Sequence, residues 1–337
     1  CHGAATPLVS HCTFTTYGSA IRSEGSSSPV VRHCQFLGCV DNMLGGAGVY
    51  LWYGSITIED SKFFECTTDN PMHSVGVVIR ADDADVTLRG VRFIENGTPW
   101  WSPIELSVLR VSDGYPMRRR LLLDEVVFWG NDTRWSMVDA VVDSVIVRGS
   151  TFVDNKVWWW DYEYPLIRAG SSTVVEDCIV AHNTCWEVLS ADDALTTHSC
   201  IFGNSEGDSL LGTHYENLFT SPLFCDLNSG ALTLHDDSPC LPAGNPWGVL
   251  MGAYGAGGCG TGVSDDVASM TAARIERIQP NPSTASGSRI SLAGVPESGA
   301  TVSIFDVRGR LIRRISVDGS DSSRAECVWD LEDGRGR

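Results

Sequence analysis

The sequence has 337 residues, of which 43% are hydrophobic and 20% are charged, which is typical of a folded chain with room for one large domain and one small one. Its formal net charge of -18 argues against nucleic acid or an anionic membrane as the main partner. There is no run of about 18 apolar residues, so the sequence predicts no membrane span.

The start of the chain is unusual. Residue 1 is a Cys, and neither an initiator Met nor a signal peptide is present. We therefore interpret the chain as a fragment of a longer, processed protein. Its 12 Cys residues are many for a cytosolic protein of this size.

A short phrase, in which an aromatic or aliphatic residue often precedes an Asn, returns eight times along the chain. The copies align on Phe14, Phe36, Phe63, Phe93, Phe128, Phe152, Val180 and Phe202, with spacings of 22, 27, 30, 35, 24, 28 and 22 residues. Irregular spacings of this size are typical of a solenoid built from strands, in which each turn carries its own loop.

Each copy of the phrase follows two further apolar stretches. In the clearest example, residues 49–52 and 55–58 alternate with period two and are separated by a Tyr53-Gly54 turn. This pattern predicts three short strands per turn and no helix of any length. Stacked turns of this kind predict an all-β fold, a right-handed parallel β-helix with three strands per rung.

The first 260 residues resemble the right-handed parallel β-helix repeat proteins, whose fold is shared with pectate lyases. The segment 45–58 (GGAGVYLWYGSITI) and the phrases ending in Asn96, Asn131, Asn155 and Asn183 carry this resemblance. It implies that the Asn side chains stack into a hydrogen-bonded ladder at one turn. Cys39 and Cys66 occupy the corresponding place in earlier copies, so the ladder should be incomplete.

Four cysteines (Cys12, Cys34, Cys178 and Cys200) share one position of the phrase, where the other copies have Ser61, Val91, Val126 and Ser150. A position that accepts Cys, Ser or Val is small and buried, which favours a stacked core column over disulfides between adjacent turns. No CxxC pair occurs, so zinc is not expected.

The repeat decays after Asn204, and residues 218–260 resemble the segment that closes many bacterial β-helix proteins. We expect this closing segment to cover the last rung. It contains Cys225, Cys240 and Cys259, where a disulfide is plausible, although their odd number leaves one sulfur to pair elsewhere or stay free. Residues 261–275 are predicted to form a linker.

Residues 276–337 contain alternating stretches that predict a small β-sandwich. The PNP at 280–282, the DVRGRL at 306–311 and the WD at 329–330 resemble the immunoglobulin-like domains of flagellar hook-capping proteins and type IX secretion sorting domains. This implies a bacterial protein that meets a secretion machinery and lies outside the cell or on its surface. Such domains end in a further Gly-x-Tyr strand, so this truncated sandwich should lack an edge strand.

The first strand of each rung supplies one candidate site. With Leu51, Ile79, Val111, Val142, Ile167 and Leu189 pointing inward, the outward residues would be Trp52, Arg80, Arg110, Asp143, Arg168 and Ser190. Such a row could bind a polyanionic glycan. Alternatively, it could be a row of hydrated side chains that only balances the charge of the acidic loops. In pectate lyases the substrate groove follows this face, with an Arg base and Asp-bound calcium. A single Asp cannot form a calcium site in this row, so we predict no cofactor. The acidic turn at 82–85 is another place where calcium could bind.

Aromatic loops supply a second candidate site. Trp158, Trp159, Trp160 and Tyr162 lie close together in one loop, and Trp100, Trp101 and Trp135 lie in others. Exposed aromatic rings stack on sugars or form protein interfaces, although a loop of this kind can also pack back onto the wall of the solenoid. Asp161 and Glu163 are a carboxylate pair in the same loop.

These observations leave three functions open. The one we favour is a secreted or surface protein that binds polysaccharide without catalysis, because we find no lyase, polygalacturonase or Ser-His-Asp motif. The alternatives are a polysaccharide lyase or glycoside hydrolase and a structural or adhesive stalk.

Overall fold

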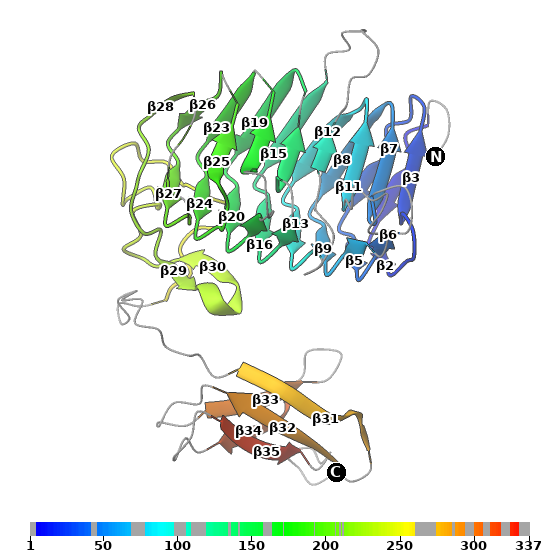
Figure 1. The fold of residues 1–337 in the computed structure, drawn as a ribbon, viewed down its shortest axis with the longest axis vertical. Coiled ribbons are helices and arrows are strands. Elements are labelled where there is room, and N and C mark those ends of the chain that lie inside the picture. The colour runs from blue at the N-terminus through cyan, green and yellow to red at the C-terminus, as the bar shows by residue number, and fades with distance from the viewer. Residues whose placement is uncertain are drawn as a thin grey trace. The chain divides into compact units, whose positions relative to one another are not determined.

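A computed structural model gives the fold of the chain (Figure 1). It describes residues 5–41, 46–68, 78–97, 106–108, 119–133, 136–140, 142–157, 164–170, 172–191, 193–205, 207–208, 210, 212–259, 274–284, 287–293, 300–305, 311–317 and 324–329. The chain divides into two units, Cys1–Thr261 and Gly262–Arg337. In the described parts no helix is long and apolar enough to cross a bilayer.

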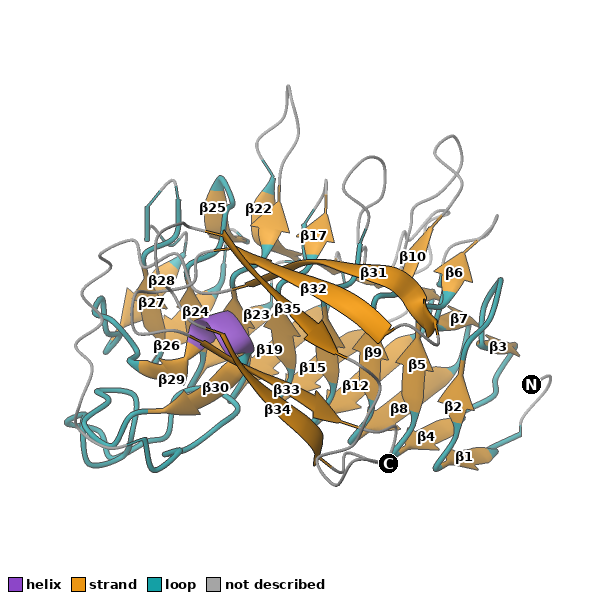
Figure 2. Cartoon of the chain, turned by 90° about the horizontal axis from the view of Figure 1, so that it is seen from below, coloured by secondary structure: helices purple, strands orange, loops and turns teal. Residues whose placement is uncertain are grey.

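The first unit is a stack of parallel strands arranged in three sheets, as predicted from the repeated phrase (Figure 2). The strands of sheet 1 are β3 (Ile21–Glu24), β7 (Val49–Trp52), β11 (Ile79–Asp82), β14 (Leu106–Val108), β18 (Val138–Ala140), β22 (Pro165–Ala169) and β25 (Glu187–Ser190). The strands of sheet 2 are β1 (Leu8–Ser10), β4 (Val30–Arg32), β8 (Ser55–Glu59), β12 (Asp85–Arg89), β15 (Arg120–Asp124), β19 (Ser144–Arg148), β23 (Thr173–Glu176), β26 (Leu195–Thr197) and β28 (Thr213–Tyr215).

Sheet 3 contains the repeated phrase itself. Its strands are β2 (Thr13–Phe14), β5 (Gln35–Leu37), β9 (Lys62–Phe64), β13 (Arg92–Ile94), β16 (Val127–Trp129), β20 (Thr151–Val153), β24 (Ile179–Ala181) and β27 (Cys200–Phe202). Two short parallel pairs follow it, β6 (Val40–Asp41) with β10 (Thr67–Thr68) and β17 (Asp132–Thr133) with β21 (Lys156–Val157). This arrangement of the first unit is consistent with a parallel β-helix.

The core of the first unit is a column of Phe rings contributed by sheet 3. Phe36, Phe63, Phe93, Phe128 and Phe152 are fully buried, and successive ring centroids lie 4.3–5.0 Å apart. Each in-register ring removes apolar surface from water, which stabilises the fold by about 1.5–3 kcal/mol per side chain. The predicted Phe column is confirmed over these rungs.

The last rung corrects the sequence alignment by one residue. Val180 pairs with Ile201, so Ile201 and not Phe202 continues the core column. Because side chains alternate along a strand, a slip of one residue turns Phe202 to the outer face. The same slip removes Cys200 from the cysteine column, where Ser199 takes its place and accepts a hydrogen bond from the Cys178 amide at 3.1 Å.

The predicted Asn ladder is present at the turn that follows sheet 3. The Nδ2 of Asn96, Asn131, Asn155 and Asn183 each donates to the Oδ1 of the Asn on the next rung, at 2.9–3.0 Å, with Asn204 as the last acceptor. Asn204 in turn donates to Asp208 at 2.8 Å. At the other end Cys66 interrupts the ladder, as expected, and its thiol donates to the Phe36 carbonyl.

Two sharp bends per rung connect the sheets. Each bend contains a residue in the left-handed region, with φ between 45° and 68° in both series. The bends after sheet 2 contain His11, His33, Asp60, Gly90, Glu125, Gly149, Asp177, His198 and Glu216. The bends after sheet 3 contain Gly38, Glu65, Glu95, Gly130, Asp154, His182 and Gly203. Gly adopts this φ without steric cost.

The closing segment packs against the outer face of sheet 3 instead of lying only over the end of the stack. A second hydrophobic cluster joins Val127, Val153, Ile179 and Cys200 of sheet 3 to buried residues of the segment; the latter are Phe224, Leu232, Leu234, Cys240 and Met251. At the outward position held by Gln35, Lys62 and Arg92 in earlier rungs, the later rungs have Val127, Thr151, Ile179 and Cys200, so this row becomes mostly apolar where the segment packs.

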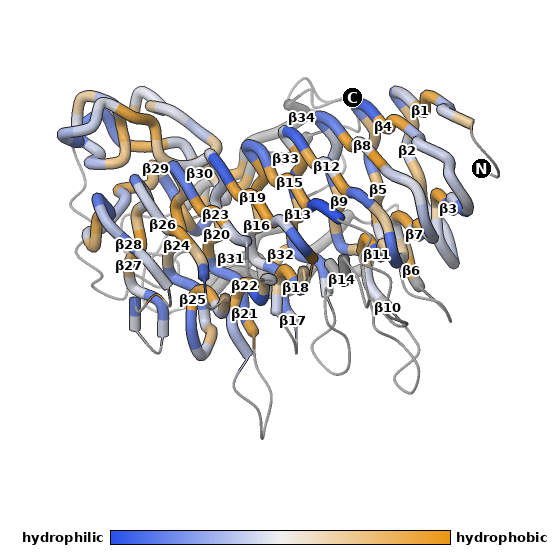
Figure 3. The backbone as a smooth tube through the Cα atoms, turned by 90° about the horizontal axis from the view of Figure 1, so that it is seen from above, coloured by the Kyte–Doolittle hydropathy of each residue, from blue (hydrophilic) through white to orange (hydrophobic). Residues whose placement is uncertain are grey.

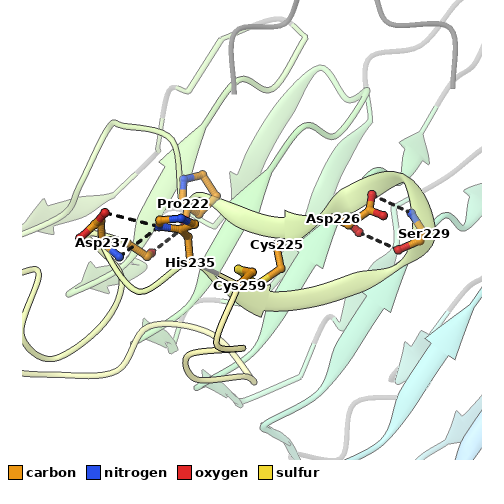
Figure 4. The surroundings of a disulfide bond; sticks show 8 residues. Pro222, Cys225, Asp226, Ser229, His235, Asp237 and Cys259 are labelled. Carbon is orange, nitrogen blue, oxygen red and sulfur yellow. Dashed lines mark hydrogen bonds and ion pairs between the residues drawn. A yellow bond between two sulfur atoms is a disulfide. The ribbon is translucent and has the colours of Figure 1, made fainter. Parts of the chain in front are cut away.

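A hairpin and a disulfide hold the closing segment together. The hairpin consists of β29 (Phe224–Asp226), the short 3-10 helix η1 (Leu227–Ser229) and β30 (Ala231–Leu234). Cys225 on β29 is bonded to Cys259 (Figure 4). Cys240, the third cysteine of the segment, is a buried thiol.

The second unit contains only antiparallel pairs in its described part. Its strands are β31 (Arg274–Thr284), β32 (Gly287–Ala293), β33 (Ala300–Phe305), β34 (Leu311–Val317) and β35 (Arg324–Trp329). They form the sheets β31-β32-β35 and β33-β34.

Candidate functional site

The outer face of sheet 1 is the candidate site, and its register differs from the predicted one. The outward row runs Arg22, Tyr50, Arg80, Asp139, Arg168 and Ser190, and Ser107 holds the register position between Arg80 and Asp139. Arg80 and Arg168 therefore share a row, as predicted. Trp52 does not belong to it, because it pairs with Asp82 and with Glu24.

The error has a simple cause. The predicted register places Leu51 beside Ile79, but Leu51 pairs with Ala81, two residues later. A shift of two residues leaves the inward and outward assignment intact, so both side chains are still buried. The shift only changes which outward residues are neighbours.

Three outward side chains at the N-terminal end of the row form one cluster. The guanidinium carbons of Arg22 and Arg80 lie 5.5 and 5.8 Å from the centroid of the Tyr50 ring, on neighbouring strands. Each Arg also bonds a carboxylate on its own strand, Arg22 to Glu24 at 2.6 Å and Arg80 to Asp82 at 2.9 Å. Cation–π contacts and ion pairs thus hold these planar groups in fixed positions.

The carboxyl of Asp82 is partly removed from water in this cluster. Burial raises its pKa, and the ion pair and hydrogen bond with Arg80 oppose that effect. Burial also raises the pKa of the Tyr50 hydroxyl. The two guanidinium groups face two carboxylates, so the cluster carries no excess positive charge and is poorly suited to grip a polyanion by charge alone.

Beside this cluster, Trp52 and Tyr53 form an exposed aromatic pair. Their ring centroids are 5.4 Å apart and the rings are nearly parallel, with 24° between them. Trp52 is 47% exposed and Tyr53 is 41% exposed. Tyr53 has a φ of 65° and precedes Gly54 at 84°. A bulky residue in the left-handed region is unusual and is found where the surrounding structure requires it.

The C-terminal end of the row is built from Asp139 and Arg168, which pair across neighbouring strands at 3.4 Å. Burial raises the pKa of Asp139, against the effect of Arg168. Its Oδ1 is buried and has no hydrogen-bond partner among the described residues. Asp143, which was predicted to occupy this row, follows β18 in a bend, and its carboxylate accepts a hydrogen bond from the Arg119 amide at 3.0 Å.

Two arginines contact the carboxylates of the acidic turn after β11. Arg119 Nε lies 2.9 Å from Asp83 Oδ1, and the Arg120 amide donates to Asp85 at 2.9 Å. Within the described ranges, no three His, Cys, Asp or Glu side chains lie together in a way that could hold a metal ion.

Several predicted site residues lie outside the described residues. They are Arg110, Trp158, Trp159, Trp160 and Tyr162, together with Trp100, Trp101, Trp135, Asp161 and Glu163.

Sequence reasoning missed Arg22 and Tyr50. A signal for them exists, because residues 21–24 (IRSE) and 79–82 (IRAD) share an apolar-Arg-small-acid pattern. Aligning these two stretches on residues 49–52 (VYLW) places Arg22, Tyr50 and Arg80 in one row.

Comparison with known proteins adds no function to this site. No protein-family model matches the sequence, and no curated protein matches it.

Proposed function

We propose that this chain is a secreted or cell-surface protein that binds polysaccharide on the outer face of sheet 1. The observation that carries the proposal is the exposed, stacked pair of Trp52 and Tyr53 beside the cluster of Arg22, Tyr50 and Arg80. Aromatic faces supply apolar contact for the C–H faces of a sugar ring at low entropic cost. Guanidinium and carboxylate groups next to them supply hydrogen bonds to hydroxyls.

The charge balance of the cluster favours a neutral glycan over a uronate polymer. Each Arg of the cluster is paired with a carboxylate on its own strand. A polyanion would have to compete with Glu24 and Asp82, whereas sugar hydroxyls can donate to these carboxylates and accept from the guanidinium groups. The proposal therefore replaces the polyanionic glycan expected from the sequence with a neutral one.

The finer features of the fold belong to the same proposal. We infer that the stack coils in the right-handed sense, as parallel crossovers almost always do, and that it is similar to pectate lyases, in which the glycan groove follows this face. We also infer that the second unit is an immunoglobulin-like sandwich of the sorting type. This would place the protein outside the cell or on its surface and would make a secretion machinery its partner.

The binding proposal is tested with a panel of neutral and uronate polysaccharides, measured by affinity electrophoresis and calorimetry. Trp52→Ala should weaken binding of the best ligand about tenfold or more, which corresponds to about 1.4 kcal/mol. Trp186→Ala is the matched control, because Trp186 is also 47% exposed but lies before β25, outside the cluster. Equal effects of both substitutions would refute the assignment, as would a panel without any ligand.

A second candidate function, polysaccharide lyase or hydrolase, rests on Asp139. A buried carboxyl with a raised pKa on a glycan-facing surface has the properties of a general acid. If the protein cleaves its ligand, Asp139→Asn should abolish release of reducing ends or unsaturated products and leave binding unchanged. Wild-type protein that binds a glycan without cleaving it would remove this candidate.

A further inference from the structure

The second sheet carries a row of charges that alternate in sign from rung to rung. Hydrophilic and hydrophobic residues alternate along these strands (Figure 3). The charged residues of the row are exposed or partly exposed, and the residue before each of them on its strand is buried. The members of the row are Arg32, Glu59, Arg89, Asp124, Arg148 and Glu176, each in register with the next. This surface is separate from the face of sheet 1, so a partner bound to it is independent of the glycan proposal.

The members of this charge row from Arg32 to Arg148 are ion-paired with their neighbours in the row. Arg32 lies 2.5 Å from Glu59, and Arg89 lies 3.5 Å from both Glu59 and Asp124. Arg148 makes two hydrogen bonds of 2.8 Å to Asp124. The arginine side chains are nevertheless 48–49% exposed, so part of each guanidinium still faces outward and can bond a second partner.

A second row runs parallel to the charge row, two residues earlier on each strand. Its members are Val30, Thr57, Thr87, Leu122, Ile146 and Val174. Ile146 is 36% exposed and the others are intermediate. Four of its six members are apolar, and apolar side chains gathered beside ordered charges are typical of a contact surface.

We propose that the outer face of sheet 2 binds a second copy of this chain, with the two stacks antiparallel. A two-fold axis along the strand direction places each row on the same row of the partner and reverses the rung order. Because the charge row alternates and has an even number of members, reversal brings opposite charges together throughout. Arg32 then faces Glu176, Glu59 faces Arg148, and Arg89 faces Asp124. The second row meets itself in the same way.

The charges also select against the other arrangement. If the two stacks were parallel, a two-fold axis along the charge row would set every member against its own counterpart, Arg against Arg and carboxylate against carboxylate. Like charges brought together at an interface are strongly unfavourable. The alternating row therefore specifies orientation as well as contact.

The size of the face indicates how tight the contact is. In the described residues sheet 2 has nine strands, the longest of five residues. In the proposed pairing β28 has no counterpart, so eight strands overlap. At about 4.8 Å between strands and about 3.3 Å per residue, the shared face measures roughly 34 by 16 Å, on the order of 500 Å² per copy. This is the low end of the range for specific interfaces, so the dimer should be reversible and should weaken as salt screens the charges.

The first test measures association of the full chain by sedimentation equilibrium at low and high salt. We expect a reversible dimer, and Ile146→Lys should raise its dissociation constant about tenfold or more, since the substitution enters the contact twice. Leu250→Lys is the matched control, because Leu250 is 38% exposed and lies in the closing segment. A wild-type chain that stays monomeric at its highest soluble concentration overturns the proposal, as does an equal effect of both substitutions.

The second test determines the orientation. Val30→Cys and Val174→Cys are prepared as separate single variants and treated with a short bifunctional thiol reagent, alone and mixed, with the wild-type chain as the background. In the antiparallel dimer Val30 faces Val174 of the other copy, so only the mixture should give cross-linked dimers above background. Cross-linking of each variant with itself and not in the mixture would show parallel stacks and contradict the proposal.

Discussion

The Asn ladder offers the sharpest test of how the stack is held together, and Asn131 is its best-placed member. Its side chain is fully buried. Its Oδ1 accepts hydrogen bonds from the backbone amide and the Nδ2 of Asn96 at 3.0 and 2.9 Å. Its Nδ2 donates to the Phe93 carbonyl and to Asn155 Oδ1, both at 2.9 Å. Asn131→Ala removes all four hydrogen bonds and leaves no polar group in the place of the amide.

The expected cost follows from this count of bonds. Each buried hydrogen bond contributes about 1 kcal/mol net, and a donor or acceptor left without a partner costs about 1–3 kcal/mol more. Asn96 loses one of the two acceptors of its Nδ2 and the acceptor of its amide, and the Phe93 carbonyl loses the Nδ2 donor. We expect Asn131→Ala to lower the free energy of unfolding by about 4–6 kcal/mol, a large share of the ~5–15 kcal/mol typical of a domain.

Urea unfolding monitored by Trp fluorescence is the assay. Of the 11 Trp residues all but Trp329 lie in the first unit, so the signal reports on the stack. Asn228→Ala is the control, because Asn228 is an exposed residue of η1 and its loss should cost less than about 0.5 kcal/mol. A cost below about 1 kcal/mol for Asn131→Ala would refute the view that the ladder is a main source of stability.

Three further predictions concern the charge row and the closing segment. The hydrogen bond from Arg148 lowers the pKa of Asp124. The ionised Asp124 therefore stabilises the fold above the ordinary Asp pKa, and this stabilisation is lost as the pH falls through the lowered pKa. Asp124→Asn should lower the free energy of unfolding in urea by about 1 kcal/mol at neutral pH and leave it unchanged in acid. Reducing the Cys225–Cys259 disulfide, which closes 34 residues, should destabilise the closing segment by about 3–4 kcal/mol, seen as faster amide exchange at Cys240 and Met251. Gly252→Val should weaken the packing of the closing segment on sheet 3 by about 1–3 kcal/mol, because a Cβ at this position would lie 2.7 Å from Ile179 and 2.8 Å from Thr151. Gly255→Ala is the control: a Cβ there would have no atom within 4 Å, so amide exchange should not change.

Much of the scaffold could be predicted from the sequence, because it rests on residues that repeat. The Phe column and the Asn ladder were identified from spacing and resemblance, since a core ring and a buried amide tolerate few replacements. The error at Phe202 arose where the column changes from Phe to Val180 and Ile201, and an aromatic one residue away looks like a better match.

The candidate site was harder to predict because outward residues vary from rung to rung. The alignment of Trp52 with Arg80 missed by two residues, and period-two alternation cannot detect such a shift. The charge row on sheet 2 was also missed. In the sequence this row appears as a charged residue at the end of the second apolar stretch of each repeat. The pattern is visible only when the repeats are aligned on the strands of sheet 2.

The most direct test of the central claim is hydroxyl-radical footprinting of the full chain with and without its best-binding polysaccharide. Binding on the face of sheet 1 predicts protection of Trp52, Tyr53 and Tyr50 on addition of the glycan, with Trp186 and Leu250 as reactive as before. Protection of Leu250 with Trp52 and Tyr53 still reactive would contradict the assignment of the glycan to this face.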